Sequence, residues 1–271
     1  MQHGSAGPVW RNPVRARLEA GKPAFAITIT TPSVEAAAHA ATLGFHFLWI
    51  EMEHSPITLE TLRLMVLASR GLPAAVFARV PVVETWTAKR VLDQGVAGVI
   101  FPFVGTPEKA ACASAACRYP PAGNRGSGAG AAVRAWPLAG NYYDSADANV
   151  MTICVVEEAS ALARIDEIAA TPGVDAIFIG TSDLSFSMGF RGRQDEPALR
   201  EAISHIAKAA LRQGKFLGRP AGTHEQARQF MDDGFLLFQM PTEIGLMEIG
   251  AKHILGPFGT DGVPEEGRAI Y

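Results

Sequence analysis

Acidic and imidazole side chains stand directly after an apolar segment near the start of the chain. The stretch "LWIEMEHSP", residues 48–56, opens with a run apolar enough to be a buried strand and then places Glu51, Glu53 and His54 together. An imidazole whose unperturbed pKa lies near neutrality suits proton transfer. Neighbouring carboxylates can orient the ring and raise its basicity. His54 is therefore a candidate general base, although a lone histidine after a strand also serves to brace a loop.

Two further carboxylates follow later apolar segments. Glu157 lies in "TICVVEE" and Asp183 ends "DAIFIGTSD". If these segments are neighbouring strands, the two acids lie close together, and like charges at that distance need a cation or a shared proton. Two hard oxygen ligands without a nearby cysteine suit Mg²⁺ or Mn²⁺ better than Zn²⁺. The alternative is that one of them forms a salt bridge with Arg79 or Arg219 and that no metal binds.

An arginine and a strand-to-helix turn are further candidates for binding a negatively charged substrate. Arg79, in "FARVP", can bind a keto oxygen or carboxylate and stabilise an enolate; alternatively it only neutralises a neighbouring carboxylate, Glu51 or Glu157. The turn "IGTSDLS" offers a run of backbone N–H groups that can hold a carboxylate. These amides belong to Gly180, Thr181 and Ser182. The alternative is that this segment is an ordinary strand-to-helix turn without a binding role.

The elements that must position these residues alternate along the chain. Short apolar runs rich in β-formers predict strands at 25–30, 45–53, 74–81, 98–104, 152–158, 175–183, 215–220 and 235–241. Segments of helical period follow them at 33–44, 58–71, 85–95, 106–118, 159–170, 196–214, 223–234 and 242–254. Glycines stand at the predicted helix ends, where a left-handed residue is favoured.

Eight strand–helix units in series predict an α/β fold, a (β/α)₈ TIM barrel. An open doubly wound sheet is the rival, but it usually has a glycine-rich first turn, and "TITTPS" is not one. In a barrel, chemistry sits at the carboxyl ends of the strands. The polar residues that end strands two, three, five, six and seven are therefore expected at one mouth.

The whole chain, 1–271, is expected to be one barrel domain with an N-terminal extension over 1–22. Residues 119–150 interrupt the alternation with a long loop after the fourth helix, and a connection of this length is functional or disordered. Its tryptophan and tyrosines argue against plain disorder. Because it leaves from the amino-terminal face of its own barrel, it is expected to serve a neighbouring subunit.

Composition narrows the class of protein. The net charge of −3 lacks the basic footprint that nucleic-acid binding needs, and no window is apolar enough to span a membrane. The three cysteines, Cys112, Cys117 and Cys154, have no regular spacing and suggest reduced thiols in a cytosol. The start of the chain has no apolar segment of the kind that a secretory signal requires. A cytoplasmic protein without nucleic-acid or membrane partners is expected.

Together these segments resemble the HpcH/HpaI family of metal-dependent (class II) 2-keto-acid aldolases. The resemblance runs from about Phe25 to about Gly250 and rests on five segments in the right order. These are "EMEHSP", "ARVP", "RYPPAGNRGSG", "VVEE" and "IGTSDLSFSMG". It implies a barrel of the phosphoenolpyruvate/pyruvate-binding type whose last helix is swapped with a partner subunit. It also implies a homohexamer built as a trimer of dimers.

The resemblance also implies residue roles. A divalent cation, Mg²⁺ or Mn²⁺ with Co²⁺ as a further possibility, would be held by Glu157 and Asp183 and chelated by pyruvate or its enolate. The substrate carboxylate would rest on the amides of residues 180–182, with Arg79 on the keto oxygen and His54 moving the proton. Glu53 and Arg125 are assigned to substrate binding. Asp93 matches a carboxylate paired with the catalytic histidine, but it lies late in a helix, far from its own mouth, so its partner belongs to another subunit.

Four departures from the family pattern bear on the reaction. Glu51 replaces an aspartate, Val155 replaces a glutamine near the metal, and Thr181 replaces a proline. Strand eight ends in "FQMPTE" instead of a small-residue turn. The metal ligands themselves are kept.

The leading hypothesis is a lyase that reversibly cleaves a 4-hydroxy-2-keto acid to pyruvate and an aldehyde through a metal-bound enolate. Alternatives are an enzyme that couples decarboxylation of an oxaloacetate-like donor to C–C bond formation, or an inactive metal-binding barrel. A Schiff-base aldolase needs a lysine at the carboxyl end of a strand. Lys89, Lys109 and Lys208 lie in predicted helices, and Lys215 enters a strand at its other end.

Overall fold

The computed structural model describes residues 10–136 and 141–259 and forms one closed barrel of eight parallel strands. β1 pairs with both β2 and β8, which closes the sheet. The strands are β1 (Ala24–Ile29), β2 (Phe47–Glu51), β3 (Ala75–Arg79), β4 (Gly98–Phe101), β5 (Met151–Val156), β6 (Ala176–Ile179), β7 (Phe216–Pro220) and β8 (Leu237–Thr242). The predicted (β/α)₈ fold is confirmed, and each strand lies within one residue of its predicted range.

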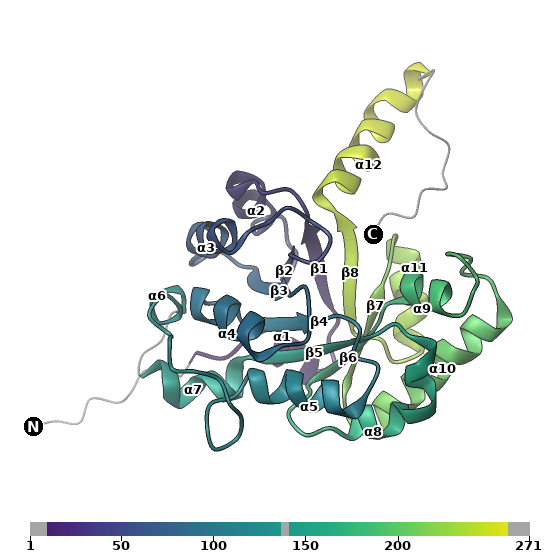
Figure 1. The fold of residues 1–271 in the computed structure, drawn as a ribbon. Coiled ribbons are helices and arrows are strands. Elements are labelled where there is room, and N and C mark those ends of the chain that lie inside the picture. Colours follow the sequence, from purple (N-terminus) through teal and green to yellow (C-terminus); the bar gives the residue numbers. More distant parts are fainter. Residues whose placement is uncertain (1–9, 137–140, 260–271) are drawn as a thin grey trace, which may run out of the picture.

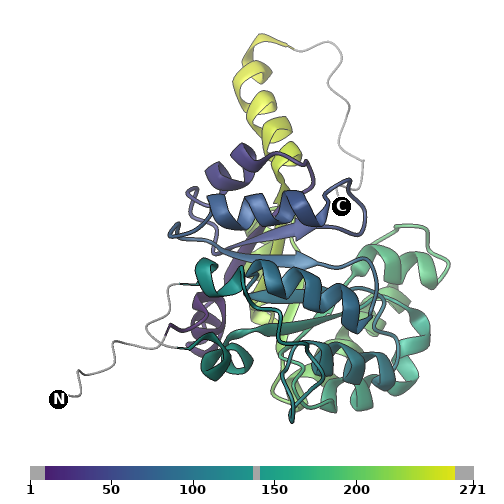
Figure 2. The same cartoon turned by 60° about the vertical axis from the view of Figure 1, so that its left-hand side comes forward.

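Helices surround the barrel (Figure 1, Figure 2). They are α1 (Pro13–Glu19), α2 (Val34–Ala40), α3 (Leu59–Ala68), α4 (Thr85–Gln94), α5 (Pro107–Ala116), α6 (Ala132–Ala135), α7 (Tyr142–Asn149), α8 (Ile165–Ala170), α9 (Thr181–Ser187), α10 (Pro197–Arg212), α11 (His224–Asp232) and α12 (Glu243–Leu255), with 3₁₀ turns η1 (Ala159–Arg164) and η2 (Gly256–Phe258). Side chains of Ser33, Thr58 and Thr223 accept hydrogen bonds from first-turn amides. Within the described ranges, no helix has the length and apolarity needed to cross a membrane.

The last helix, α12, leaves the barrel and extends away from it in both views (Figure 1, Figure 2). Its start is tied down because Glu243 accepts hydrogen bonds from the backbone amides of Thr30 and Thr31, at 2.8 and 2.6 Å. Beyond that point, apolar side chains face solvent, with Met247 and Ile254 each 66% exposed. An apolar helix face of this kind is unusual in a monomer, where such side chains normally pack on the sheet.

Strand periodicity decides which side chains enter the barrel. Trp49, Phe77 and Phe178 are fully buried, and Trp49 packs edge-on against Phe178 with ring centroids 5.0 Å apart. In the strand register, Trp49 lies beside Phe77, and Phe178 lies beside Val155. Side chains two residues further along each strand point the same way. The aromatic residues therefore fill the interior, and the next inward residues form the mouth.

The long connection at 119–150 is folded against the base of the barrel over its described part. It contains α6 and α7, and the indole of buried Trp136 donates to the carbonyl oxygen of Gly95 at 2.8 Å. The Arg125 guanidinium lies over the rings of Tyr119 and Tyr142, at 4.6 and 5.5 Å. Residues 137–140 of the predicted loop lie outside the described residues. The packing places this segment at the end of the barrel opposite the mouth.

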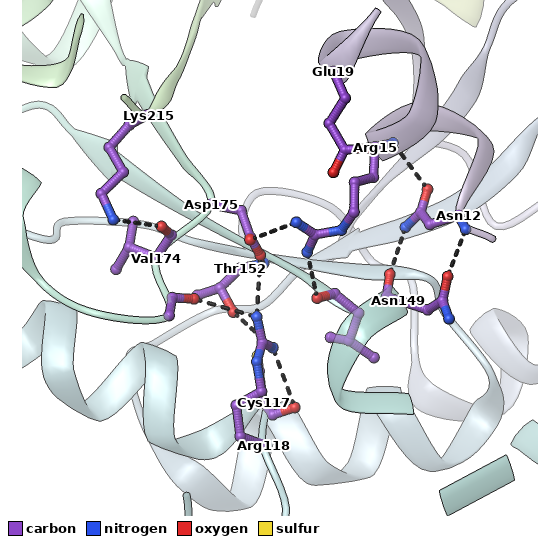
Figure 3. A network of polar contacts seen from close by, with 12 residues as sticks. Asn12, Arg15, Glu19, Cys117, Arg118, Asn149, Thr152, Val174, Asp175 and Lys215 are labelled. Atoms are coloured by element: carbon purple, nitrogen blue, oxygen red, sulfur yellow. Dashed lines mark hydrogen bonds and ion pairs between the residues drawn. The ribbon is translucent and has the colours of Figure 1, made fainter. Parts of the chain in front are cut away.

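Polar side chains join the N-terminal segment to the base of the barrel (Figure 3). Buried Asn12 donates from its side chain to the carbonyl oxygens of Ala97 and Asn149, at 2.9 and 2.8 Å. Asp175 forms ion pairs with the guanidinium groups of Arg15 and Arg118, at 2.8 and 3.2 Å. It also accepts a hydrogen bond from the backbone amide of Thr152 at 2.8 Å. Residues 10–19 thus fasten the extension to strands that are far away in sequence.

Replacing Asp175 with asparagine should lower the free energy of unfolding by about 2–3 kcal/mol, because two largely buried guanidinium groups lose their counter-charge. Urea unfolding monitored by circular dichroism measures this change. Asp166→Asn is the matched control, since Asp166 pairs with Arg212 on the open surface and should change stability by less than about 0.5 kcal/mol. Equal effects of the two substitutions would contradict a structural role for the base network.

Candidate active site

Strand register brings the polar residues together at the carboxyl ends of β2, β3, β5 and β6. Glu51 lies beside Arg79 in the register of β2 and β3. Each stands two residues after an inward aromatic side chain, so both point into the mouth. Glu157 and Gly180 follow inward Val155 and Phe178 in the same way. The sequence therefore places two carboxylates, a guanidinium and a glycine around one opening.

Glu51 organises one side of this opening. Its buried carboxylate accepts the backbone amides of Glu53 and His54 on one oxygen, at 2.8 and 3.1 Å. The other oxygen accepts the indole N–H of Trp49 at 3.2 Å and Nε of Arg79 at 2.6 Å. These four hydrogen bonds use the capacity of a carboxylate. Glu51 therefore fixes the loop that carries His54 and also orients Arg79.

Arg79 is held between two acids and still lines the mouth. Beyond its bond to Glu51, Nη1 lies 3.1 Å from a carboxylate oxygen of Glu53. Burial raises the pKa of Glu53, and this effect is opposed by the charge of Arg79. Arg79 thus does neutralise Glu51, as its alternative interpretation expected, and also Glu53. It is a rigid cation whose direction is fixed before any ligand binds.

His54 stands at the rim of the same opening. Its ring is 47% exposed, and Nε2 lies 3.7 Å from Oε1 of Glu53. The ring is therefore accessible to a ligand in the mouth and has a carboxylate at its side. This arrangement is compatible with proton transfer, since a catalytic base must reach both its substrate and an orienting group.

Glu157 is the most strongly perturbed acid of the mouth. It is 2% exposed, and one carboxylate oxygen accepts the backbone amide of Phe103 at 2.7 Å. Burial raises the pKa of Glu157 to about 8, and the nearby charges of Asp183 and Glu53 act in the same direction. Glu157 therefore sits where a negative charge is costly unless a cation joins it.

Two features around Glu157 were not predicted from the sequence. Phe103 has a positive φ of 50°, which turns its amide toward the carboxylate. Residue type gives no sign of this, because the segment 98–104 reads as an ordinary strand. Gly180 is the second feature: a Cβ there would lie 2.4 Å from Oε2 of Glu157. A glycine at the end of an apolar strand was the available signal for such a close approach.

The turn after β6 supplies Asp183 and the predicted amide groups. Gly180 uses its own N–H, which donates to the carbonyl oxygen of Val156 at 3.2 Å, so the expected contribution of its amide is corrected. Thr181 and Ser182 are the first residues of α9, and first-turn amides have no acceptor inside the helix. These two amides, with Asp183 one residue later, border the opening.

A cavity of about 1040 Å³ opens at the mouth and continues along α10 and α11. Its lining includes His54, Arg79, Glu157 and Asp183, together with Thr181 and Ser182. Val155 and Gln239 form part of its wall, so an apolar side chain stands near the carboxylates. Across residues 10–136 and 141–259, no three histidine, cysteine, aspartate or glutamate side chains gather as a metal cluster. Any cation here would have two protein carboxylates and would complete its coordination from ligand and water oxygens.

Asp93 and Arg125 lie away from the mouth of their own barrel, and Arg219 has contacts other than those expected. Asp93 ends near Arg125 at the base of the barrel, with 3.4 Å between carboxylate and guanidinium. Neither residue lines the mouth cavity of its own chain. Arg219 lines the cavity that opens at the mouth, but the expected ion pair with Glu157 or Asp183 is not formed among the described residues. Its guanidinium instead lies 3.5 Å from the ring centroid of Phe230 in α11, because Arg219 stands between two inward positions of β7.

Curated relatives of this chain include bacterial aldolases. A hydroxypyruvate/pyruvate aldolase of Paraburkholderia phytofirmans is 35% identical over 239 residues, which cover 86% of this chain and 92% of the relative. A 5-keto-4-deoxy-D-glucarate aldolase of Salmonella arizonae is 34% identical over 215 residues, covering 79% and 84%. The similarity thus covers at least 79% of this chain and at least 84% of each of the two relatives.

Solved structures agree with the sequence comparison. An HpcH/HpaI aldolase/citrate lyase family protein from Burkholderia cenocepacia superposes with a TM-score of 0.83 at 30% identity, covering 91% of this chain and 99% of that one. The family profile described as HpcH/HpaI aldolase/citrate lyase matches residues 29–247. The sequence resemblance is therefore confirmed, and the chain belongs to the HpcH/HpaI aldolase/citrate lyase family.

Proposed function

We propose that this protein reversibly cleaves a 4-hydroxy-2-keto acid to pyruvate and an aldehyde, with a divalent cation bound at Glu157 and Asp183. The observation that carries the proposal is the buried Glu157 carboxylate, whose pKa is raised to about 8 by burial and by neighbouring acids. The aldolases among its relatives support the same reaction class.

The residues present fit a hard divalent cation. Glu157 and Asp183 offer only oxygen donors and interact electrostatically with each other and with Glu53. Mg²⁺ and Mn²⁺ are commonly held by one or two carboxylates, with substrate and water oxygens filling the other positions. Two protein ligands at an open mouth match that pattern. When bound, the cation would supply Lewis-acid stabilisation of negative charge on the keto oxygen.

The chain's own residues would bind the substrate, stabilise the developing charge and transfer the proton. The amides of Thr181 and Ser182 bind the substrate carboxylate, because they are first-turn donors that border the cavity. Arg79 orients the keto oxygen and offsets the negative charge that grows there as the C3–C4 bond breaks. His54 accepts the proton of the C4 hydroxyl, and the bonding electrons pass to C3 and on into the enolate. Protonation of C3 then gives pyruvate.

The pairing of Asp93 with a histidine remains a proposal about the assembled protein. In its own chain Asp93 lies at the base beside Arg125, and Arg125 is buried. We propose that this region serves the mouth of a neighbouring subunit, where Asp93 orients His54 and the loop that carries Arg125 helps to shape the aldehyde pocket. The trimer-of-dimers hexamer expected from the family resemblance would supply that neighbour.

The reaction is tested with a panel of 4-hydroxy-2-keto acids and coupled detection of pyruvate. Activity should require Mg²⁺ or Mn²⁺ and vanish with a chelator. Asp183→Ala should lose cation binding and turnover together, whereas His54→Ala should keep cation affinity but slow cleavage by about 10²–10⁴-fold, the range for a positioned acid–base group. Full chelator-resistant activity, or unchanged turnover of both variants, would overturn the proposal. Oxaloacetate with an aldehyde tests the decarboxylative alternative.

Gly180→Ala should displace Glu157, because the new methyl group would lie 2.4 Å from its carboxylate oxygen and 2.8 Å from its Cβ. The backbone of Gly180 has a negative φ of −76°, so alanine adds a steric conflict without a left-handed strain. We expect a loss of Mn²⁺ affinity of at least about tenfold, measured by titration calorimetry. Gly130→Ala is the matched control, since no atom lies within 4 Å of its added Cβ. Wild-type Mn²⁺ affinity in Gly180→Ala would remove Glu157 from the cation site.

We further propose that α12 is exchanged between two subunits. Its apolar face is exposed, and a separate cavity of about 460 Å³ lies between α11 and the α2–β2 connection. Apolar side chains line that cavity, including Phe25, Leu43, Phe45, Met231 and Met240. A helix that leaves its own barrel and an apolar groove on the barrel are complementary, which is the arrangement of a domain swap.

Met247→Asp should weaken this assembly, because it places a charge on an apolar contact. We expect a shift toward monomers in analytical ultracentrifugation at micromolar concentration. Glu248→Gln, on the same helix but at a polar exposed position, is the control and should leave the assembly intact. A monomeric wild-type protein at the same concentration would contradict the exchange.

A further inference from the structure

The mouth cavity continues beyond the reaction site as a groove on the flank of the barrel. Its lining passes from Asp183 over Pro220 and Gly222, at the end of β7, to residues of α10 and α11. Ile203, Ala207 and Leu211 of α10 form one apolar wall. Phe230 and Phe235 form the other. The groove is therefore long, mostly apolar and open to solvent.

Arg219 lies at the floor of this groove. Its guanidinium is 3.5 Å from the ring centroid of Phe230 and 5.3 Å from that of Phe235. Nε is buried and has no hydrogen-bond partner. Within the described part of the chain, no carboxylate lies within ion-pair distance of Arg219. Burial lowers the pKa of Arg219 to about 10, so the group is still charged at neutral pH while part of its hydration is lost.

The charges along the groove have one predominant sign. Arg200 and Lys208 stand on α10 eight residues apart, on exposed positions that line the cavity. Asp233 is the acid that acts on Arg219, and it does so only from a distance longer than an ion pair. The groove therefore combines apolar walls with three cations and one acid. A partly desolvated cation without a counter-charge is unfavourable in free energy, and a bound anion would offset that cost.

We propose that the groove between α10 and α11 binds a small organic anion, whose phosphate or carboxylate pairs with Arg219 while its apolar part lies between Leu211 and Phe230. A guanidinium presents a planar fork that suits both anions. The two aromatic rings hold that fork in a fixed direction, which reduces the entropy lost on binding. Arg219 faces away from the barrel interior, whereas Glu157 faces into it, so the proposal does not depend on the aldol reaction.

Titration calorimetry of the full chain with phenyl phosphate and with phenylacetate tests this site. The two probes share an aromatic body and distinguish phosphate from carboxylate, and inorganic phosphate reports the anion without the body. We expect saturable binding of at least one aromatic probe, tighter than that of inorganic phosphate. Arg219→Leu should weaken it by at least about tenfold, because the charge-assisted hydrogen bonds are lost while the apolar volume is kept.

Two further variants locate the binding. Arg212→Leu removes an exposed arginine of the same helix, which pairs with Asp166 outside the groove, and should leave probe affinity unchanged. Asp183→Ala removes an acid of the mouth and should not weaken probe binding. Equal affinity in wild type and Arg219→Leu would overturn the proposal. So would loss of binding in Asp183→Ala, which would move the probe to the mouth, or an absence of saturable binding of both aromatic probes at millimolar concentration.

Discussion

The crowding of acids at the barrel mouth is the constraint on which the site depends. Glu157 is buried beside Asp183 and Glu53, and its ionised form is disfavoured by burial and by both neighbours. Two of the mouth's other acids are matched internally, since Glu51 and Glu53 share the Arg79 guanidinium. Neither Glu157 nor Asp183 forms an ion pair with an arginine or lysine among the described residues, and Arg79 acts on Glu157 only from a longer distance. A divalent cation would offset this repulsion and would also stabilise the negative charge of an enolate.

Local contacts hold the acids of the mouth in these positions. The amide of Phe103 holds one oxygen of Glu157, and the missing side chain of Gly180 leaves room for the other. On the opposite side, Glu51 fixes Arg79 and the backbone of the His54 loop through four hydrogen bonds. The Glu51 carboxylate accepts hydrogen bonds from both the indole of Trp49 and the Arg79 guanidinium. The reactive groups are thus oriented by the barrel before a ligand arrives.

Much of this could be predicted from the sequence, because strand–helix alternation fixes the barrel and the barrel rule fixes the mouth. Glu157 and Asp183 followed from their positions at strand ends. The contacts of Arg219 did not follow, because its position at a strand end does not show which side of the sheet its side chain faces; that depends on the alternation along β7. The positive φ of Phe103 and the packing of Arg125 on Tyr119 and Tyr142 depend on long-range contacts that no local pattern encodes. The outward course of α12 was expected from the family resemblance and not from its own sequence pattern, since that apolar pattern would suit packing on its own barrel equally well.

The central claim is that Glu157 and Asp183 hold one divalent cation at the mouth. Crystals grown with Mn²⁺ and pyruvate, measured near the manganese absorption edge, test it most directly. The account predicts one anomalous peak in contact with both carboxylates, with the pyruvate keto oxygen and carboxylate beside it and Arg79 facing the keto oxygen. A mouth without an anomalous peak, with Glu157 and Asp183 turned apart while pyruvate is bound, would contradict it.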